Sequence, residues 1–261
     1  MNVREFYAYM CGKIPAELTL TGDRDGMSCC PDPEREVNRV MIALDVTDSV
    51  IDEAAEDGCE VILAHHPMLY GGIDSVCADE YSGNRIIKLV RSGISVMSFH
   101  TRLDAAEGGV NDLLADSLGL EVISRFAENG ICRLGILDAP VSAPLFADRI
   151  RQALGAPFVE YSDGGRLITK VAVCGGSAGS MIGEAIAAGA DALVGGEIGY
   201  HRLTDGPGNG ISLFAAGHFY TENRVCHRLF ELTAEAGLIP VITFSNRISV
   251  STEGAGCGYG V

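Results

Sequence analysis

The 261-residue sequence contains no tryptophan, and only 7% of its residues are aromatic. This scarcity argues against a surface that binds single-stranded nucleic acid by stacking, because such surfaces need aromatic side chains. Basic residues are also few, with 19 Lys and Arg against 35 Asp and Glu, and the formal net charge is −16. The sequence has no basic patch of the kind that duplex-binding proteins carry, so we do not expect a nucleic-acid partner.

Long apolar runs are absent as well. No run approaches the roughly 20 residues that cross a bilayer, so we expect no membrane partner. Residues 1–15 include Arg4, Glu5 and Lys13 and lack the apolar stretch of a signal peptide. The nine cysteines include no CxxC pair, which excludes a zinc ribbon, and their odd number does not suit a disulfide framework. Reduced thiols in the cytoplasm are the simplest interpretation.

Glycine is plentiful, with 33 residues, and 47% of the chain is hydrophobic. Short apolar runs alternate with helical patterns along both halves of the chain. The first clear unit is a strand at 40–44, a helix at 49–57 and a strand at 61–64, an order that implies parallel strands joined by a right-handed crossover. We therefore predict an α/β protein of two α/β domains, with mixed or parallel sheets flanked by helices.

The predicted elements can be placed along the chain. Helices are expected at 2–11, 49–57 (capped by Asp48 or Ser49), 84–92, 110–118 and 221–236, and in stretches ending at 154 and 188. Strands are expected at 40–44, 61–64, 94–99, 131–137, 170–174, 192–195, 211–215 and 241–244. Residues 22–33 read as a loop, and the glycine-rich tail from Gly254 is expected to fray.

The strand at 61–64 ends in His65, His66 and Pro67. In open α/β sheets, ligands bind beyond the carboxyl ends of the strands, so this pair is expected at the mouth of a site. Successive strand side chains point to opposite faces. The two histidines can therefore converge only if the chain turns there, or if each binds a different metal ion. The alternative is a loop histidine beside a core histidine.

Two further predicted strands end in metal-binding residue types. His100 and Asp104 follow the strand at 94–99, and His218 and Glu222 follow the strand at 211–215. Four of the six histidines of the chain thus lie at three strand ends. This concentration is the main functional signal in the sequence.

Glu222 lies in line with the apolar stripe of the helix predicted at 221–236. A buried, unpaired carboxylate costs several kcal/mol, and a bound metal ion removes that cost. His218, four residues earlier, lies on the same side of the turn. The alternative is a capping glutamate that points to solvent at the helix N-terminus.

The candidate ligands offer nitrogen and oxygen without thiolate. This set suits Zn, Mn, Fe, Co or Ni, and suits Ca or Mg poorly. Five or six such groups are too many for one tetrahedral zinc and predict two divalent ions per subunit, roughly 3.5–4 Å apart and bridged by a carboxylate. Such a pair lowers the pKa of a bridging water and generates hydroxide near neutral pH, which points to hydrolysis.

Three weaker patterns in the sequence each allow two interpretations. The segment from Gly175 to Gly179 could hold a phosphate with its N–H groups, or could be a tight turn. His201 could transfer a proton in the site, or lie on the surface. Asp45 could support a ligand histidine, or start a helix. His227 is expected on a solvated helix face.

Six stretches resemble the NGG-interacting-factor-like dinuclear-metal family, also labelled GTP cyclohydrolase I type 2 homologs. They occur in the family's order at 43–47, 64–67, 100–104, 108–112, 173–177 and 216–222. The Cys29-Cys30-Pro31 segment departs from the family pattern.

The resemblance implies a division of the ligands between two metal ions. His65 and Asp104 would bind one ion, His66 and His218 the other, and Glu222 would bridge them. The residue that matches His100 is near the metals without being a standard ligand, so His100 is expected to support the site or to act as an acid or base.

The resemblance also implies the architecture and the assembly. The first domain would span residues 1–125 plus about 219–261, so that the C-terminal segment returns to it, and the second would span 126–218. The family pattern implies a toroidal homohexamer whose metals face an inner cavity.

Our leading hypothesis from the sequence is a metal-dependent hydrolase that uses a metal-bridging hydroxide, with His100 or His201 moving protons. A small anionic substrate or a purine nucleotide such as GTP is the expected ligand, and the nucleotide rests on the family label. The alternatives are a non-enzymatic, hexameric metal-binding regulator or scaffold, and a plain α/β protein that binds no metal.

Overall fold

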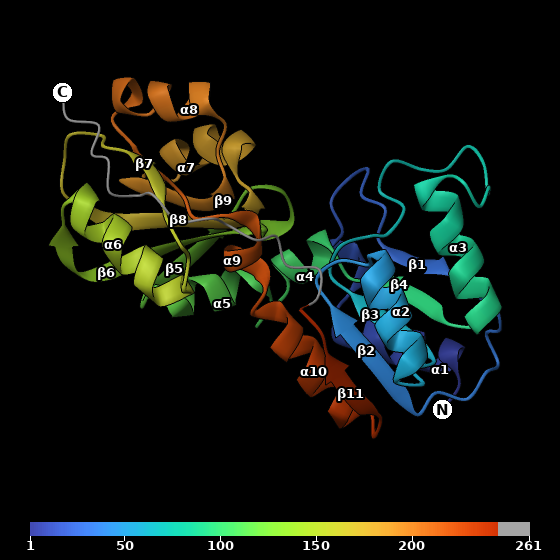
Figure 1. Cartoon of the computed structure of the whole chain (residues 1–261). Helices are drawn as coiled ribbons and strands as arrows, with labels where there is room; N and C mark the ends of the chain where they lie inside the picture. The colour runs from blue at the N-terminus through green and yellow to red at the C-terminus, as the bar shows by residue number, and fades with distance from the viewer. Residues whose placement is uncertain (245–261) are drawn as a thin grey trace.

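The structure is a computed structural model that describes residues 1–244. The tail from Gly254, predicted to fray, lies outside the described residues. Two mixed sheets flanked by helices form two lobes (Figure 1). This arrangement confirms the predicted α/β class.

The first sheet has the strand order β1-β4-β3-β2-β11. Its strands are β1 (Gly26–Cys29), β2 (Arg39–Ala43), β3 (Val61–Ala64), β4 (Ser95–Ser98) and β11 (Ile239–Ile242). Only the β1–β4 pair is antiparallel. All four residues of β3 are buried, as expected for a parallel strand covered on both faces.

Helices cover both faces of the first sheet, and each face has its own core cluster. On one face lie α1 (Val3–Lys13) and α10 (Val225–Glu235), and on the other α2 (Asp48–Glu56) and α3 (Tyr81–Ser92). A capping box of Asn2 and Glu5 fixes the start of α1.

The second sheet has the strand order β5-β6-β8-β9-β10-β7. Its strands are β5 (Glu121–Phe126), β6 (Cys132–Val141), β7 (Glu160–Ser162), β8 (Ile168–Ser177), β9 (Ala192–Glu197) and β10 (Ser212–Ala215). The central strands β8, β9 and β10 are parallel, whereas β5, β6 and β7 join as antiparallel neighbours.

The second sheet is also covered on both faces. One face packs against α5 (Val110–Ser117) and α6 (Ala143–Leu154), and the other against α7 (Ile182–Ala187) and α8 (Tyr200–Asp205). Two short helices, α4 (Thr101–Ala105) and α9 (His218–Glu222), lie between the lobes in Figure 1. Short 3₁₀ turns occur at Ala16–Leu18, Glu128–Gly130, Gly179–Met181 and Pro207–Asn209.

The C-terminal segment returns to the first lobe, because β11 pairs in parallel with β2. The predicted boundary between residues 125 and 126 falls inside β5, a strand that pairs with β6 in the second sheet.

The predicted helix at 221–236 is wrong in its extent. Glu222 ends α9, and α10 begins only at Val225. The N–H groups of Cys226 and His227 bond three residues back, to Asn223 and Arg224, so a tight turn interrupts the helical ladder.

Several smaller predictions also need correction. The predicted loop at 22–33 contains β1, the strand predicted at 241–244 lies at Ile239–Ile242, and β5 and β7 were not predicted at all. Thr47, rather than Asp48 or Ser49, caps α2 by accepting a hydrogen bond from the N–H of Val50.

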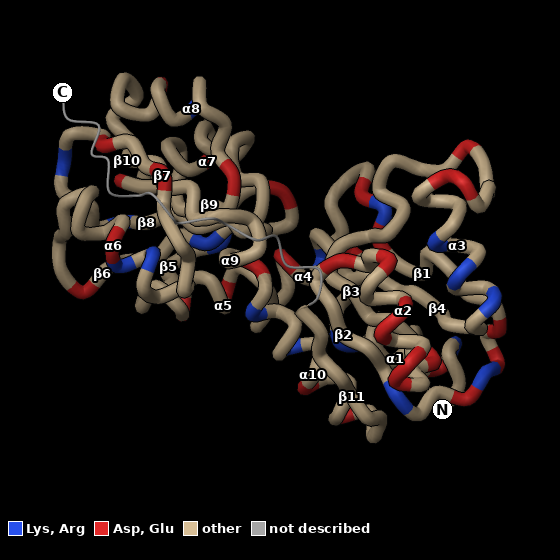
Figure 2. The backbone as a smooth tube through the Cα atoms, viewed as in Figure 1, with Lys and Arg blue, Asp and Glu red and all other residues tan. Residues whose placement is uncertain are grey.

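Acidic residues are spread along the backbone of both lobes, in keeping with the net charge of −16 (Figure 2). None of the helices within residues 1–244 has the length and apolar character that crossing a bilayer requires. The eight cysteines in this part of the chain are free thiols.

Candidate metal centre

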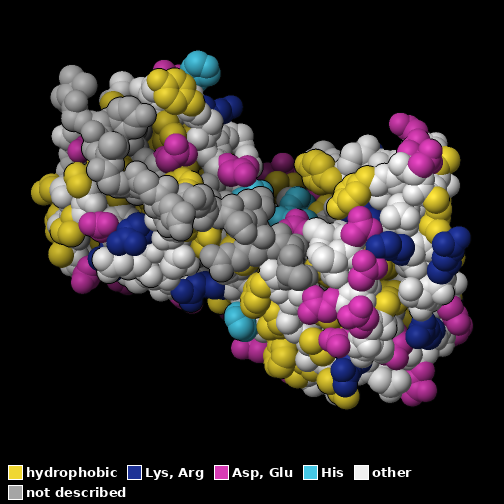
Figure 3. Space-filling model, in the orientation of Figure 1, with side chains coloured by type: hydrophobic (Ala, Val, Ile, Leu, Met, Phe, Trp, Pro, Cys, Tyr) yellow, Lys and Arg dark blue, Asp and Glu magenta, His cyan; other side chains and the backbone are white. Residues whose placement is uncertain are grey.

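A cavity of about 590 Å³ lies where the carboxyl ends of strands from both sheets meet. Figure 3 shows histidine side chains in the hollow between the two lobes. The first lobe contributes residues that follow β2, β3 and β4, and the second contributes residues at the ends of β8, β9 and β10. This is the position that parallel α/β sheets use for ligands.

His65 follows β3 and is completely buried. Its Nδ1 is 3.0 Å from the carbonyl oxygen of Phe99. Its Nε2 lies 3.5 Å from Oδ1 of Asp104 and 3.9 Å from Oε1 of Glu222. Nε2 therefore points to two buried carboxylates.

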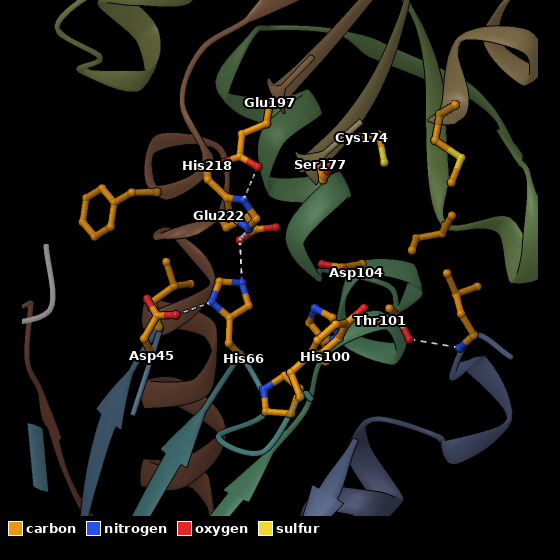
Figure 4. Close-up of a pocket in the computed structure, with 18 residues that line it drawn as sticks. Asp45, His66, His100, Thr101, Asp104, Cys174, Ser177, Glu197, His218 and Glu222 are labelled. Carbon is orange, nitrogen blue, oxygen red and sulfur yellow. Dashed lines mark hydrogen bonds and ion pairs between the residues drawn. The ribbon is translucent and has the colours of Figure 1, made fainter. Parts of the chain in front are cut away.

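His66 has a similar arrangement around its ring. Its Nδ1 is 2.7 Å from Oδ1 of Asp45, and its Nε2 is 3.0 Å from Oε2 of Glu222. In Figure 4, His66 lies between these two carboxylates. The two adjacent histidines thus converge on opposite oxygens of Glu222, with ring centroids 4.8 Å apart.

His218 and Glu222 face each other along α9, with Nε2 3.0 Å from Oε2. Nδ1 of His218 is 3.4 Å from Oε2 of Glu197, at the end of β9 (Figure 4). Only 4% of Glu222 is exposed, so its burial was predicted correctly although the long helix that suggested it is interrupted.

His100 repeats the same pattern with a carboxylate that the sequence analysis did not single out. Its Nδ1 is 2.8 Å from Oδ1 of Asp23, and Asp23 also accepts hydrogen bonds from the N–H and hydroxyl of Thr101. These bonds outweigh burial and lower the pKa of Asp23. Asp23 comes from a loop 77 residues away, and its only sequence signal is an acidic pair with Asp25.

All four histidines therefore have an oxygen near Nδ1, and Nε2 of His65, His66 and His218 faces the carboxylates of Asp104 or Glu222. An acceptor at Nδ1 places the ring proton there and leaves the Nε2 lone pair free to bind a metal.

Burial and hydrogen bonding move the pKa values of the two adjacent histidines in opposite directions. Burial lowers the pKa of His65 to about 3, which keeps its imidazole neutral. Burial also disfavours the charged form of His66, but the hydrogen bonds to Asp45 and Glu222 outweigh it and raise the pKa of His66 to about 10.

The buried carboxyl groups of Asp104 and Glu222 each disfavour ionisation of the other. Burial and the nearby Glu222 raise the pKa of Asp104 well above its usual range. Burial opposes ionisation of Glu222 too, but hydrogen bonds from His218 and His66 lower its pKa. Two ionised carboxylates in one buried site are mutually destabilising unless a cation lies between them.

These residues fit a divalent cation. Within the described part of the chain, Nε2 of His65 and Oδ1 of Asp104 are buried and lack a hydrogen-bond partner. Ligand atoms of His65, Asp104 and Glu222 lie within 4.8 Å of one another, and so do those of His66, His218 and Glu222. His65, His66 and His100 form a third such group.

Glycines at the end of β8 make room for the carboxylate. Gly176 has a φ of +62°, and a Cβ there would lie 3.0 Å from Nε2 of His218 and would collide with Oε1 of Glu222.

Of the two interpretations of the segment from Gly175 to Gly179, its hydrogen bonds favour the tight turn over the phosphate-binding loop. The N–H groups of Gly175, Gly176 and Ala178 bond to Asn111, Thr221 and Glu197.

The remaining histidines lie away from the centre. His201, a candidate for proton transfer or for a surface position, is exposed on α8 and is not among the residues that line the cavity. His227 is exposed on α10, as predicted.

The fold and this cluster define an α/β protein with a candidate metal centre of histidines and carboxylates. The chain belongs to the Duf34/NIF3 (NGG1p interacting factor 3) family, whose profile matches residues 1–248.

Two similar relatives come from clostridia, and both are named GTP cyclohydrolase 1 type 2 homolog. The Clostridium perfringens protein is 32% identical over 211 residues, which cover 78% of this chain and 80% of the relative. The Clostridium acetobutylicum protein is 33% identical over 216 residues, which cover 79% and 81%.

A solved structure has the same fold. The crystal structure of a Staphylococcus aureus hypothetical protein superposes with a TM-score of 0.85 at 24% identity, covering 96% of this chain and 99% of that chain.

Proposed function

We propose that this chain is a metal-dependent hydrolase that holds two divalent ions between its lobes. The observation that carries the proposal is the convergence of His65, His66, Asp104, His218 and Glu222, with buried nitrogen and oxygen atoms left without partners. Two of these residues are carboxylates whose joint ionisation needs a cation. The nitrogen and oxygen set favours Zn, Mn, Fe, Co or Ni.

His65 and Asp104 would hold one ion, His66 and His218 the other, and Glu222 would contact both, in keeping with the two groups of ligand atoms. When bound, such ions supply Lewis acidity and lower the pKa of a coordinated water. Asp45 and Glu197 orient His66 and His218 through their Nδ1 atoms.

His100 is the proposed proton-transfer residue. It lines the cavity, and Asp23 fixes its ring through Nδ1. His100 would accept at Nε2 the proton that the attacking water releases and would deliver it to the leaving group, with Asp23 stabilising the charged ring.

The experiment is an assay of the purified full chain with Mn, Zn or Fe against a panel of hydrolysable substrates. GTP is the first substrate to assay, because it occurs in the relatives' name. We expect metal-dependent turnover that Asp104→Asn reduces at least 100-fold. The matched control is Asp116→Asn, the same substitution on the exposed side of α5. Absence of turnover with every metal would remove the hydrolase proposal and favour a metal-binding regulator or scaffold.

The proposal includes a cytoplasmic homohexamer built from chains of two α/β domains. Free cysteines support a reducing compartment. The edge strand β5 exposes Val122 and Ile123, which supports association through the second lobe. Light scattering should give six times the chain mass of 27.5 kDa; a monomeric mass would contradict the assembly.

A further inference from the structure

The wall of the cavity outside the histidine and carboxylate cluster is largely apolar. It is formed by side chains from both lobes: Leu20, Leu44, Tyr70, Ile131, Met181 and Phe219. Tyr70 is 66% exposed, with its ring 6.1 Å from that of His100 at nearly a right angle. Such a wall can pack against a flat ring in the way that ligand pockets usually do.

Within the part of the chain that the structure describes, no lysine or arginine side chain lines the cavity. Its acidic lining residues are four carboxylates: Asp45, Asp104, Glu197 and Glu222. Two nearby arginines have other partners, since Arg102 pairs with Asp25 and Arg202 donates to the carbonyl of Gly179.

Three backbone donors beside the cavity are also occupied. The N–H groups of Gly175, Gly176 and Ala178 are bonded within the protein. The hydroxyl of Thr101 donates to Asp23 at 2.6 Å and accepts from the N–H of Leu20. Phosphate sites usually present free N–H groups, arginine or lysine.

Charge balance leads to the same conclusion. Two divalent ions would bring four positive charges against the four lining carboxylates, so the filled cavity is close to neutral. A polyphosphate with several negative charges gains little from such a site and meets Asp45 and Glu197 at close range.

We infer that the cavity binds the uncharged, ring-shaped part of a substrate, and that it does not recognise a polyphosphate chain. This inference rests on the proposed function, because ions bound by the histidines and carboxylates would hold the polar end of the ligand while the apolar wall holds its ring. A phosphorylated substrate would place its phosphates outside the cavity. The volume of about 590 Å³ suits a ring with a few substituents.

The test is calorimetric binding to the metal-loaded full chain with three probes. Benzohydroxamate and acetohydroxamate have the same metal-binding group, but the first carries a phenyl ring where the second carries a methyl group. Tripolyphosphate is a metal-binding polyanion without a ring. We expect benzohydroxamate to bind at least tenfold more tightly than acetohydroxamate, and tripolyphosphate to bind most weakly. The inference is overturned if tripolyphosphate binds more tightly than benzohydroxamate, or if the phenyl ring adds no affinity.

A pair of variants tests the missing charge directly. Met181→Lys should raise the affinity for tripolyphosphate at least fivefold, whereas Met181→Gln, which adds polarity without charge, should not. Equal affinities in the two variants would count against the inference. Circular dichroism and metal content check that both variants fold.

The outcomes separate this inference from the proposed function. If the metal-loaded protein ranks the probes as expected but hydrolyses no substrate, the hydrolase proposal is wrong and the inferred preference for an uncharged ring remains. If the protein hydrolyses a substrate but prefers tripolyphosphate, the hydrolase proposal remains and the inferred preference for an uncharged ring is wrong.

Discussion

At the scale of single residues, the centre depends on how each histidine ring is held. Asp45, Phe99 and Glu197 supply the oxygens near Nδ1 of His66, His65 and His218. A held ring loses less rotational freedom when Nε2 binds an ion, and its tautomer is already the one that binding needs.

Removing one of these supports should weaken metal binding without removing a ligand. Asp45→Ala is expected to lower metal affinity about 10–100-fold, while Asp45→Asn, which keeps an oxygen acceptor, should lower it less. Competition with a coloured chelator measures the affinity. Equal affinities in the wild type and Asp45→Ala would show that the contact to His66 is incidental.

Gly176 offers a second test at this scale. Gly176→Ala adds a Cβ against Glu222 and His218 and strains a backbone with φ of +62°, so both stability and metal affinity should fall. Gly183→Ala on α7 is the control, because a Cβ there meets nothing within 4 Å. Calorimetry and chelator competition should separate the two variants; a Gly176→Ala protein with unchanged affinity would argue against close packing around Glu222.

At the scale of elements, a buried ion pair links α5 to the second sheet. Asp112 on α5 pairs with Arg133 on β6, whose side chain has no exposure and also donates to the carbonyls of Ala105 and Ala106. Burial alone would raise the pKa of Asp112, but the bonds from Arg133 and the N–H of Gly108 outweigh it and lower the pKa.

The pKa of Asp112 is lower in the folded protein than its value of about 3.9 in the unfolded chain. The ion pair therefore stabilises the fold fully at a pH above about 3.9. This stabilisation is lost as the pH falls through the folded pKa. Asp112→Asn should therefore cost on the order of 3 kcal/mol at pH 7 and progressively less below about pH 4. Urea unfolding at several pH values measures the difference; a difference that does not shrink in acid would contradict it.

Strong local patterns explain which elements could be predicted. The run Val61 to Ala64 is apolar throughout and buried on both faces, so its strand was predicted with correct bounds. By contrast, β5 has no buried residue, and β7 has three residues, so neither shows an apolar pattern. Their pairing depends on neighbouring strands that a local pattern does not reveal.

The candidate site shows the same limit. His65, His66, Asp104, His218 and Glu222 were identifiable because metal-binding types gather at strand ends and match a family pattern. Asp23 was not, because its partner His100 is 77 positions away and the intervening chain folds through β2 and β3.

At the scale of the whole molecule, the centre joins the two lobes. His65, His66 and Asp104 follow strands of the first sheet, whereas His218 and Glu222 lie on α9, which follows β10 of the second. An ion that binds both sets binds only the folded arrangement, so it should stabilise the molecule by mass action.

Metal removal should therefore lower the unfolding temperature of the whole chain. At a metal concentration about 100 times the dissociation constant, the gain is about 2.7 kcal/mol, which corresponds to ~5 °C or more in a chain of this size. Differential scanning calorimetry of chelator-treated and reloaded protein measures the shift. Identical melting curves would show that no ion links the lobes.

The most direct test of the central claim is anomalous diffraction from crystals of the full chain loaded with Mn or Zn. The account predicts two peaks per chain, one within bonding distance of His65 and Asp104 and the other within bonding distance of His66 and His218, with Glu222 reaching both. Crystals that show no peak among these side chains, or peaks only at other sites, would contradict it.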